Sequence, residues 1–219
     1  MRVWSFQRLL FTVSTLTLPV FFDPVQGKPL NLYLTGAAGV NNPTQRNNTG
    51  VLGSFQEYTD PGVTAELGLG VDFGRFRVET TYAIDASKLR GYTNVRGVDF
   101  DYASGGEVRK QSVFLSGYWD VLAHSGSALS PYIGAGIGYS NLDVRDFSDP
   151  GLSYEGYNRS LLGYQFKAGL SMKTSLKSRI FAEGFYRGTS GYQTFDGFDT
   201  WETDSFGSWG GQFGVRFGI

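Results

Sequence analysis

The chain has 219 residues, with 31 Gly, 16% aromatic residues, one His and no Cys. Its formal net charge of −1 offers no basic field for nucleic acid, and the lack of Cys excludes disulfides, thiolate metal ligands and a Cys nucleophile. The glycine share is about twice the usual one, but the many aromatic side chains supply enough apolar surface for a folded core.

The first segment has the pattern of a secretory signal peptide. Arg2 and Arg8 precede a largely apolar run over residues 9–22. The small residues Val25 and Gly27 suit cleavage after Gly27. An uncleaved anchor is the alternative, because the cleavage site is imperfect. We expect residues 1–27 to be a signal peptide and residues 28–219 to be one exported domain. That domain has no apolar run long enough for a membrane helix, so it is either soluble or a membrane β-barrel.

The exported part alternates between apolar and polar residues, which is typical of β-strands. In residues 63–73 every odd-numbered position is apolar, while the even-numbered positions carry polar residues and glycines. Eight such segments are expected to be strands: residues 30–40, 63–73, 76–84, 111–121, 132–142, 161–172, 179–188 and 209–219. The seventh fits least well, because two phenylalanines share a face with its charged residues.

The connections between these strands alternate in length. Residues 41–62, 85–110, 143–160 and 189–208 are expected to be long polar loops, whereas Gly74 and Arg75 make a two-residue hairpin turn. Short turns at one end and long loops at the other are typical of a transmembrane barrel. Aromatic residues lie near both ends of the outward faces, where the two membrane interfaces would be.

Four motifs carry a resemblance to a known family. They are PYIGAGIGY at residues 131–139, FRVE at 76–79, VFLSGYWD at 113–120 and FGVRF at 213–217. With these motifs the chain resembles the OmpA/OmpX-like outer-membrane β-barrels, which include related bacterial surface antigens. The resemblance implies an all-β, eight-stranded antiparallel up-and-down transmembrane β-barrel in the outer membrane of a Gram-negative type of cell. Its implied partners are outer-membrane lipid, lipopolysaccharide and the barrel assembly machinery.

Charged residues on the inward faces form the main candidate site. They are Glu66, Asp72, Arg77, Glu79, Lys167, Glu183, Arg187 and Arg216, with Asp120 near the short-turn end. An eight-stranded barrel is only wide enough for its own side chains, and buried charges are costly unless they are paired. We therefore interpret these residues as a structural plug. A narrow porin-like channel is the alternative.

Hairpin geometry predicts which inward residues face each other. A two-residue turn at Gly74 and Arg75 places Asp72 opposite Arg77 and Glu79 opposite Gly70. A turn over residues 173–177 places Lys167 opposite Glu183, Phe181 over Gly169 and Phe185 over Gln165. Cross-strand pairs of these kinds fix the register of a sheet.

The four long loops are the expected contact face for an external ligand or a host or cell-surface partner. They carry eight basic and fourteen acidic residues, an excess of six acidic ones, together with several aromatic residues that suit contact with a partner. Asp143, Asp146 and Asp149 lack the spacing of a calcium-binding loop, so no metal site is expected.

No enzymatic function is expected. The only histidine, His124, lies in a predicted short turn beside Ser125 and Ser127, and neighbours in one turn do not provide the geometry of a catalytic triad. We predict no catalytic residues and no cofactor. A soluble exported lipocalin-like binding barrel, with the aliphatic rows inside, is a further alternative.

Overall fold

The computed structural model describes residues 31–51, 53–94, 96–121, 129–149, 152–195 and 200–219. The predicted signal peptide at residues 1–27 and the turn with His124 lie outside these ranges. Within the described ranges, no helix has the length and apolar character needed to cross a bilayer.

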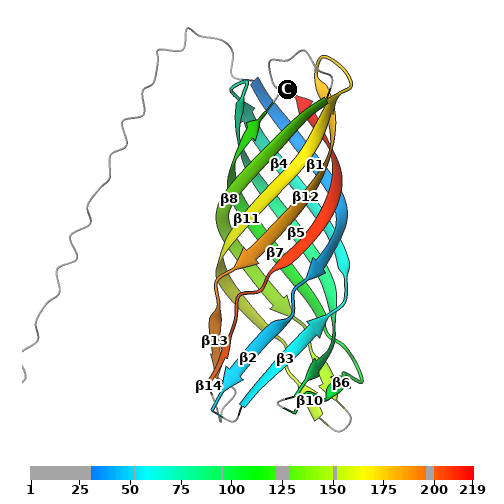
Figure 1. The fold of residues 1–219 in the computed structure, drawn as a ribbon, viewed down its shortest axis with the longest axis vertical. Coiled ribbons are helices and arrows are strands. Elements are labelled where there is room, and N and C mark those ends of the chain that lie inside the picture. Colours follow the sequence, from blue (N-terminus) through cyan, green and yellow to red (C-terminus); the bar gives the residue numbers. More distant parts are fainter. Residues whose placement is uncertain (1–30, 52, 95, 122–128, 150–151, 196–199) are drawn as a thin grey trace, which may run out of the picture.

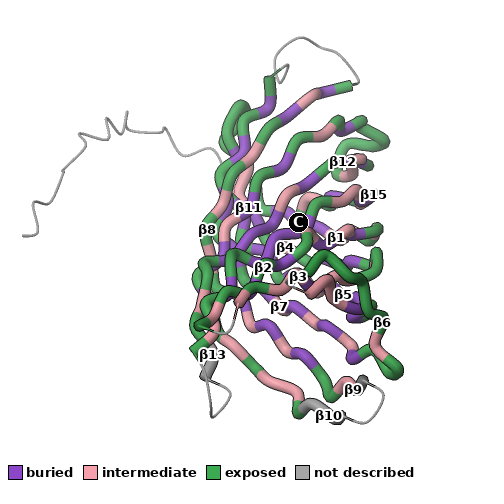
Figure 2. Tube along the Cα trace, turned by 60° about the horizontal axis from the view of Figure 1, so that its bottom comes forward, coloured by how far each residue is buried: buried purple, intermediate pink, exposed green. Residues whose placement is uncertain are grey.

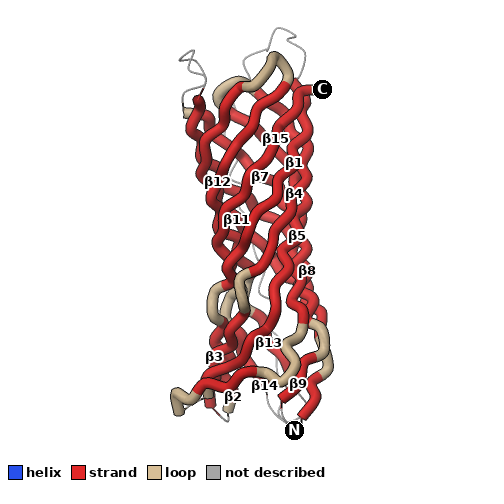
Figure 3. The backbone as a smooth tube through the Cα atoms, turned by 90° about the vertical axis from the view of Figure 1, so that its right-hand side faces the viewer, coloured by secondary structure: helices blue, strands red, loops and turns tan. Residues whose placement is uncertain are grey.

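Eight long strands build the wall of the molecule (Figure 1). They are β1 (Asn31–Pro43), β4 (Gly62–Asp72), β5 (Phe76–Thr93), β7 (Glu107–Asp120), β8 (Leu129–Val144), β11 (Tyr157–Lys173), β12 (Ser178–Thr189) and β15 (Ser208–Gly218). Each pairs antiparallel with the next of these strands along the chain, and β15 pairs with β1 beside it (Figure 3). All eight predicted strands are therefore present, and the predicted up-and-down order is confirmed.

Seven shorter strands lie at the end opposite the short turns, which is the lower end in Figure 1, and two of them form a separate sheet. They are β2 (Arg46–Gly50), β3 (Gly53–Thr59), β6 (Asp99–Asp101), β9 (Phe147–Asp149), β10 (Leu152–Tyr154), β13 (Tyr192–Phe195) and β14 (Thr200–Thr203). Strands β13, β14, β2 and β3 pair in that order and continue onto β5. The predicted long polar loops thus contain paired strands, because backbone pairing continues beyond the apolar part of the wall.

The outward face carries an apolar band. Buried and exposed residues alternate along each strand (Figure 2), and Leu67, Ile137 and Phe213 are 68%, 70% and 76% exposed. Along β5 the outward positions stay apolar or uncharged from Phe76 onward and become charged at Lys88. A band of about ten residues per tilted strand is about 25 Å tall, which matches the hydrocarbon layer of a bilayer. A soluble barrel with an apolar lumen would require the opposite orientation.

The inward face joins aromatic rings to glycines across the strands. The described part of the chain contains six such pairs: Tyr33–Gly70, Phe114–Gly138, Tyr118–Gly134, Tyr132–Gly169, Phe181–Gly214 and Phe185–Gly210. A Cβ atom on Gly134 would lie 2.3 Å from Cδ1 of Tyr118, so the ring needs a glycine beneath it. The inward glycines thus make room for large side chains in a narrow barrel.

The predicted register of the first hairpin is confirmed. Asp72 lies opposite Arg77, and Gly70 lies opposite Glu79. The turn between them contains Gly74 with a φ of 94°, a conformation that favours glycine.

The predicted register of β11 and β12 was wrong by two residues. Lys167 lies opposite Phe185, and Gly169 lies opposite Glu183. The turn spans residues 174–178 rather than 173–177, because the Thr174 N–H donates to the carbonyl oxygen of Ser178 at 3.0 Å.

The two phenylalanines of β12 therefore lie over other partners than predicted. Phe181 lies opposite Ser171 on β11 and over Gly214 on β15, and Phe185 lies over Gly210 rather than over Gln165. Both glycines are on β15, whereas the hairpin prediction considered only the pairing of β12 with β11.

Candidate functional site

The interior contains a balanced set of buried charges. Among the described residues, six acidic and six basic side chains are buried: Glu57, Glu66, Glu79, Asp85, Asp120, Glu183, Arg46, Arg77, Lys110, Lys167, Arg187 and Arg216. All of the predicted interior residues except Asp72 belong to this set. Asp72 is half-buried at the short-turn end.

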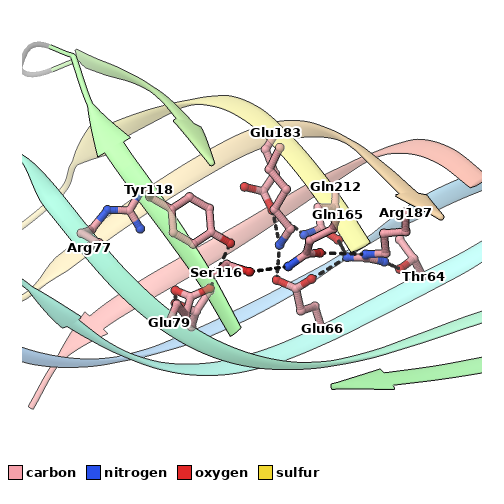
Figure 4. Close-up of polar contacts among 12 residues, drawn as sticks. Thr64, Glu66, Arg77, Glu79, Ser116, Tyr118, Gln165, Glu183, Arg187 and Gln212 are labelled. Atoms are coloured by element: carbon pink, nitrogen blue, oxygen red, sulfur yellow. Dashed lines mark hydrogen bonds and ion pairs between the residues drawn. The ribbon is translucent and has the colours of Figure 1, made fainter. Parts of the chain in front are cut away.

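The middle of the barrel holds a chain of alternating charges, of which Figure 4 labels Glu183, Glu66 and Arg187. Lys167 contacts the carboxylates of Glu66 and Glu183, the latter at 3.0 Å between Nζ and Oε1. Arg187 contacts Glu66 at 2.5 Å and Asp85 at 2.8 Å. Lys110 ends the chain, with Nζ 3.4 Å from Oδ2 of Asp85. Three acidic and three basic groups therefore alternate from Glu183 to Lys110.

Neutral side chains complete the hydrogen bonding of this chain. Gln212 and Tyr132 donate to the two carboxylate oxygens of Glu183 at 2.6 and 2.7 Å. Arg187 donates to Oγ1 of Thr64 at 2.8 Å, and Gln165 donates to Oγ of Ser116 at 2.8 Å. The bonds to Glu183 and from Arg187 satisfy charges that would otherwise be costly to bury, and the bond from Gln165 joins two neutral side chains.

A second cluster lies toward the short turns. Arg77 pairs with Asp120 at 2.6 Å and not with Asp72, although Asp72 is its cross-strand neighbour. The Asp72 carboxylate instead accepts the N–H of Gly74 at 2.7 Å. The Arg77 guanidinium also lies over the ring of Tyr118, 4.6 Å from its centre.

Glu79 lies in the same region and makes no ion pair with a described residue. Its carboxylate accepts hydrogen bonds from Thr35 at 2.9 Å and from Tyr118 at 3.4 Å. Two neutral donors therefore stabilise this charge.

A third cluster closes the opposite end of the lumen. Arg46 pairs with Glu57 at 2.9 Å and donates to Tyr157 at 3.1 Å. Burial acts to lower the pKa of Arg46, but the carboxylate of Glu57 and the phenol of Tyr157 outweigh it, so the pKa is raised above its usual value. Beside this pair is an apolar cluster of Leu89, Val108, Leu142, Val144 and Phe206.

The sequence prediction placed four of these charges in loops. Arg46, Glu57, Asp85 and Lys110 are 1%, 7%, 3% and 1% exposed and lie inside the barrel. Asp85 and Lys110 could have been found by continuing the alternation of their strands beyond the apolar band. These two acidic and two basic residues no longer count among the loop residues, so the excess of six acidic residues in the loops is unchanged. Among the described residues, no group of three or more potential ligands is arranged to hold a metal ion.

The fold, the apolar band and the paired interior define a transmembrane β-barrel of the outer-membrane type. Residues 69–214 match the surface antigen family (Surface_Ag_2), and the chain belongs to that family. The predicted resemblance is thus confirmed, and the protein is an outer-membrane protein of a Gram-negative type of cell.

Two relatives and two solved structures illustrate the similarity. Outer membrane protein PagN of Salmonella typhimurium is 24% identical in an alignment 198 residues long that covers 81% of each chain. Major surface antigen 4 of Anaplasma marginale is 35% identical over 82 residues, which are 37% of this chain and 25% of that protein.

The structure of outer membrane protein OprG from Pseudomonas aeruginosa has a TM-score of 0.63 at 13% identity, covering 88% of this chain and 98% of that one. Neisserial surface protein A has a TM-score of 0.53 at 15% identity, covering 86% and 97%. At these identities the structures show the shared fold, an eight-stranded outer-membrane β-barrel.

Proposed function

We propose that the protein is a closed-lumen outer-membrane barrel that acts through contacts at its extended outer end rather than by transport or catalysis. The observation that carries this proposal is the chain of alternating charges from Glu183 to Lys110 across the middle of the lumen. Long side chains such as Arg187 and Gln165, which are 0% and 1% exposed, fill this level. A packed and paired interior leaves little room for a hydrated ion.

The contact face is the part of the wall beyond the apolar band. Strand β3 continues onto β5 there, and aromatic rings pack across the strands. Phe55 lies 5.2 Å from Trp201, and Tyr92 stacks on Phe100 at 5.3 Å between ring centres. Phe100 is nevertheless 43% exposed. Ordered aromatic side chains among polar residues are typical of surfaces that bind partners.

Lipopolysaccharide and the barrel assembly machinery remain predicted partners. In support of the first, Lys88, Arg90 and Arg109 face outward just beyond the apolar band, at the depth of the outer-leaflet headgroups. Glu107 lies opposite Lys88, and Asp143 lies opposite Arg109, so basic and acidic residues lie side by side on this surface.

Conductance measurements test the closed lumen against the porin-like alternative. We expect purified barrels in a planar bilayer to show no discrete current steps. Shortening Lys167 and Arg187 together to serine removes the two central cations, and we expect measurable steps from this variant. The matched control shortens the exposed Lys88 and Arg109 to serine and should stay silent. Discrete steps from the unmodified protein would contradict the proposal.

Cell binding tests the contact face. We expect cells displaying the barrel to bind to at least one surface in a panel of immobilised glycans, matrix proteins and eukaryotic cell layers. Replacing Phe55 and Trp201 by serine should lower this binding at least tenfold, because the ring cluster is lost. Leu176→Ser at the opposite end is the control. Equal binding by all three proteins would contradict a contact role for this face.

A further inference from the structure

A cavity opens at the short-turn end of the barrel, near the C-terminus in Figure 1. Its volume is about 350 Å³, and it lies between the start of β1, the turn after β11 and the end of β15. In an outer-membrane barrel, the end with short turns faces the periplasm. The cavity is therefore at the level of the inner leaflet.

The charged lining of the cavity is mostly basic. Lys173, Lys177, Arg179 and Arg216 line it, and Asp72 is the one acidic side chain among the described lining residues. Lys173 lies directly opposite Arg179, which in turn lies directly opposite Arg216. Three cations thus form a row across adjacent strands. Like charges in directly opposite positions repel, so this row favours a bound anion.

Arg216 lacks the counter-ion that the other buried basic residues have. It is 7% exposed, yet it makes no ion pair with any described residue, and its Nε atom has no hydrogen-bond partner. Its guanidinium instead lies among the rings of Tyr33, Phe181 and Tyr132, 5.2, 5.6 and 5.8 Å from their centres. Each of the other five buried basic side chains contacts a carboxylate.

The nearby carboxylates already have other hydrogen-bond donors. Glu79 accepts from Thr35 and Tyr118, and Asp72 accepts from the N–H of Gly74. An external anion is thus the group that would complete the pairing of Arg216.

We propose that this cavity binds the phosphate group of an anionic glycerophospholipid from the inner leaflet. Arginine guanidinium groups match phosphate oxygens with two parallel hydrogen bonds, and Lys173 and Lys177 add charge at the rim. The cavity is larger than a phosphate ion alone. Its rim also carries Leu32, Leu176 and Ile219, which are 40%, 92% and 67% exposed and suit contact with the acyl and glycerol parts of a lipid.

Native mass spectrometry can test the site with defined lipids. The purified barrel is incubated in micelles with either phosphatidylglycerol or phosphatidylcholine, and the retained lipid is counted. We expect at least tenfold greater retention of phosphatidylglycerol. The combination of Arg179→Gln and Arg216→Gln should remove this preference. Arg90→Gln with Arg159→Gln, at the other end of the barrel, is the matched control and should keep it.

A second measurement distinguishes a lipid from free phosphate and controls for folding. Inorganic phosphate is titrated while the side-chain NMR signal of Arg216 is followed. Arg179→Gln alone serves as the control for folding, because Arg179 is only half-buried and its replacement disturbs the interior less than the double variant does. A response to inorganic phosphate without any preference for phosphatidylglycerol would overturn the lipid as the source. Lipid retention that the double variant leaves unchanged, or no response to either probe, would overturn the site itself.

Discussion

Lys167 illustrates how a charge is stabilised inside this barrel. Its ammonium group is buried between Glu66 and Glu183 and has no access to water. The two carboxylates also have Arg187, Gln212 and Tyr132 as partners. Among the described residues, Lys167 is nevertheless the one cation that contacts both of them, so its removal leaves an excess of negative charge in a dry interior.

Replacing Lys167 by methionine tests this arrangement. Methionine keeps most of the side-chain volume, so the change removes mainly the charge. We expect the free energy of unfolding to fall by about 3–5 kcal/mol, as for other broken buried pairs. Urea unfolding in lipid vesicles measures this, and Lys88→Met on the outer wall should stay within about 0.5 kcal/mol.

A double variant provides the check on this prediction. Adding Glu66→Gln to Lys167→Met removes one of the uncompensated carboxylates, so part of the lost stability should return. If the two substitutions are simply additive, the pair does not interact in the way that its geometry indicates.

At the level of single residues, strand alternation predicted which side chains in the middle of the barrel face inward. Alternation assigned Glu66, Lys167 and Arg187 to the inward face because they alternate with aliphatic and aromatic residues on the same strands, and all three are buried. It missed Asp85 and Lys110, because the apolar outward pattern of β5 weakens after Ile84 and the outward neighbours of Lys110 are Arg109 and Gln111. Alternation also could not predict that Arg77 pairs with Asp120. Arg77 lies between two strands, β4 and β7, and each of them carries an aspartate close enough in sequence pattern to be its partner.

The strands are held in register by rings that lie over glycines. Tyr118 on β7 covers Gly134 on β8, and Tyr132 on β8 covers Gly169 on β11. These contacts join three consecutive strands along one side of the lumen. Gly117 is also in β7, but it faces outward, and a Cβ atom there would meet nothing within 4 Å.

Two alanine substitutions compare a glycine that lies under a ring with a glycine that faces outward. Gly134→Ala places a methyl group against the Tyr118 ring, and we expect a loss of about 1–3 kcal/mol in the free energy of unfolding. Gly117→Ala, on the lipid-facing side of the adjacent strand, should be neutral or slightly stabilising. Urea unfolding of both variants measures the difference. Equal effects would show that ring contact does not determine the need for glycine at position 134.

Sequence alternation predicted the existence of all eight wall strands but not their lengths. The prediction ended β5 at Ile84, whereas the strand continues to Thr93. Beyond the membrane both faces of a strand can carry polar residues, so the apolar signal ends while the backbone pairing does not. The register error between β11 and β12 has a similar origin, because the length of a serine-rich turn is not set by hydrophobic pattern.

For the whole molecule, the central claim concerns orientation. Apolar side chains face outward in a band about as tall as a bilayer core, and six acidic and six basic side chains of the described residues balance one another inside. This orientation separates a membrane barrel from a soluble barrel with the same alternation. The sequence pattern is compatible with both orientations, because alternation alone does not show whether the apolar face or the polar face is outside.

Oxygen accessibility along β4 tests the orientation most directly. The chain has no Cys, so single cysteines introduced one at a time from residue 63 to residue 69 can each carry one nitroxide label. In lipid bilayers we expect high accessibility to oxygen and low accessibility to a polar nickel reagent at Val63, Ala65, Leu67 and Leu69. The even-numbered positions between them should show little accessibility to oxygen. The reverse pattern, with oxygen reaching the even-numbered positions and the nickel reagent the odd-numbered ones, would contradict the account.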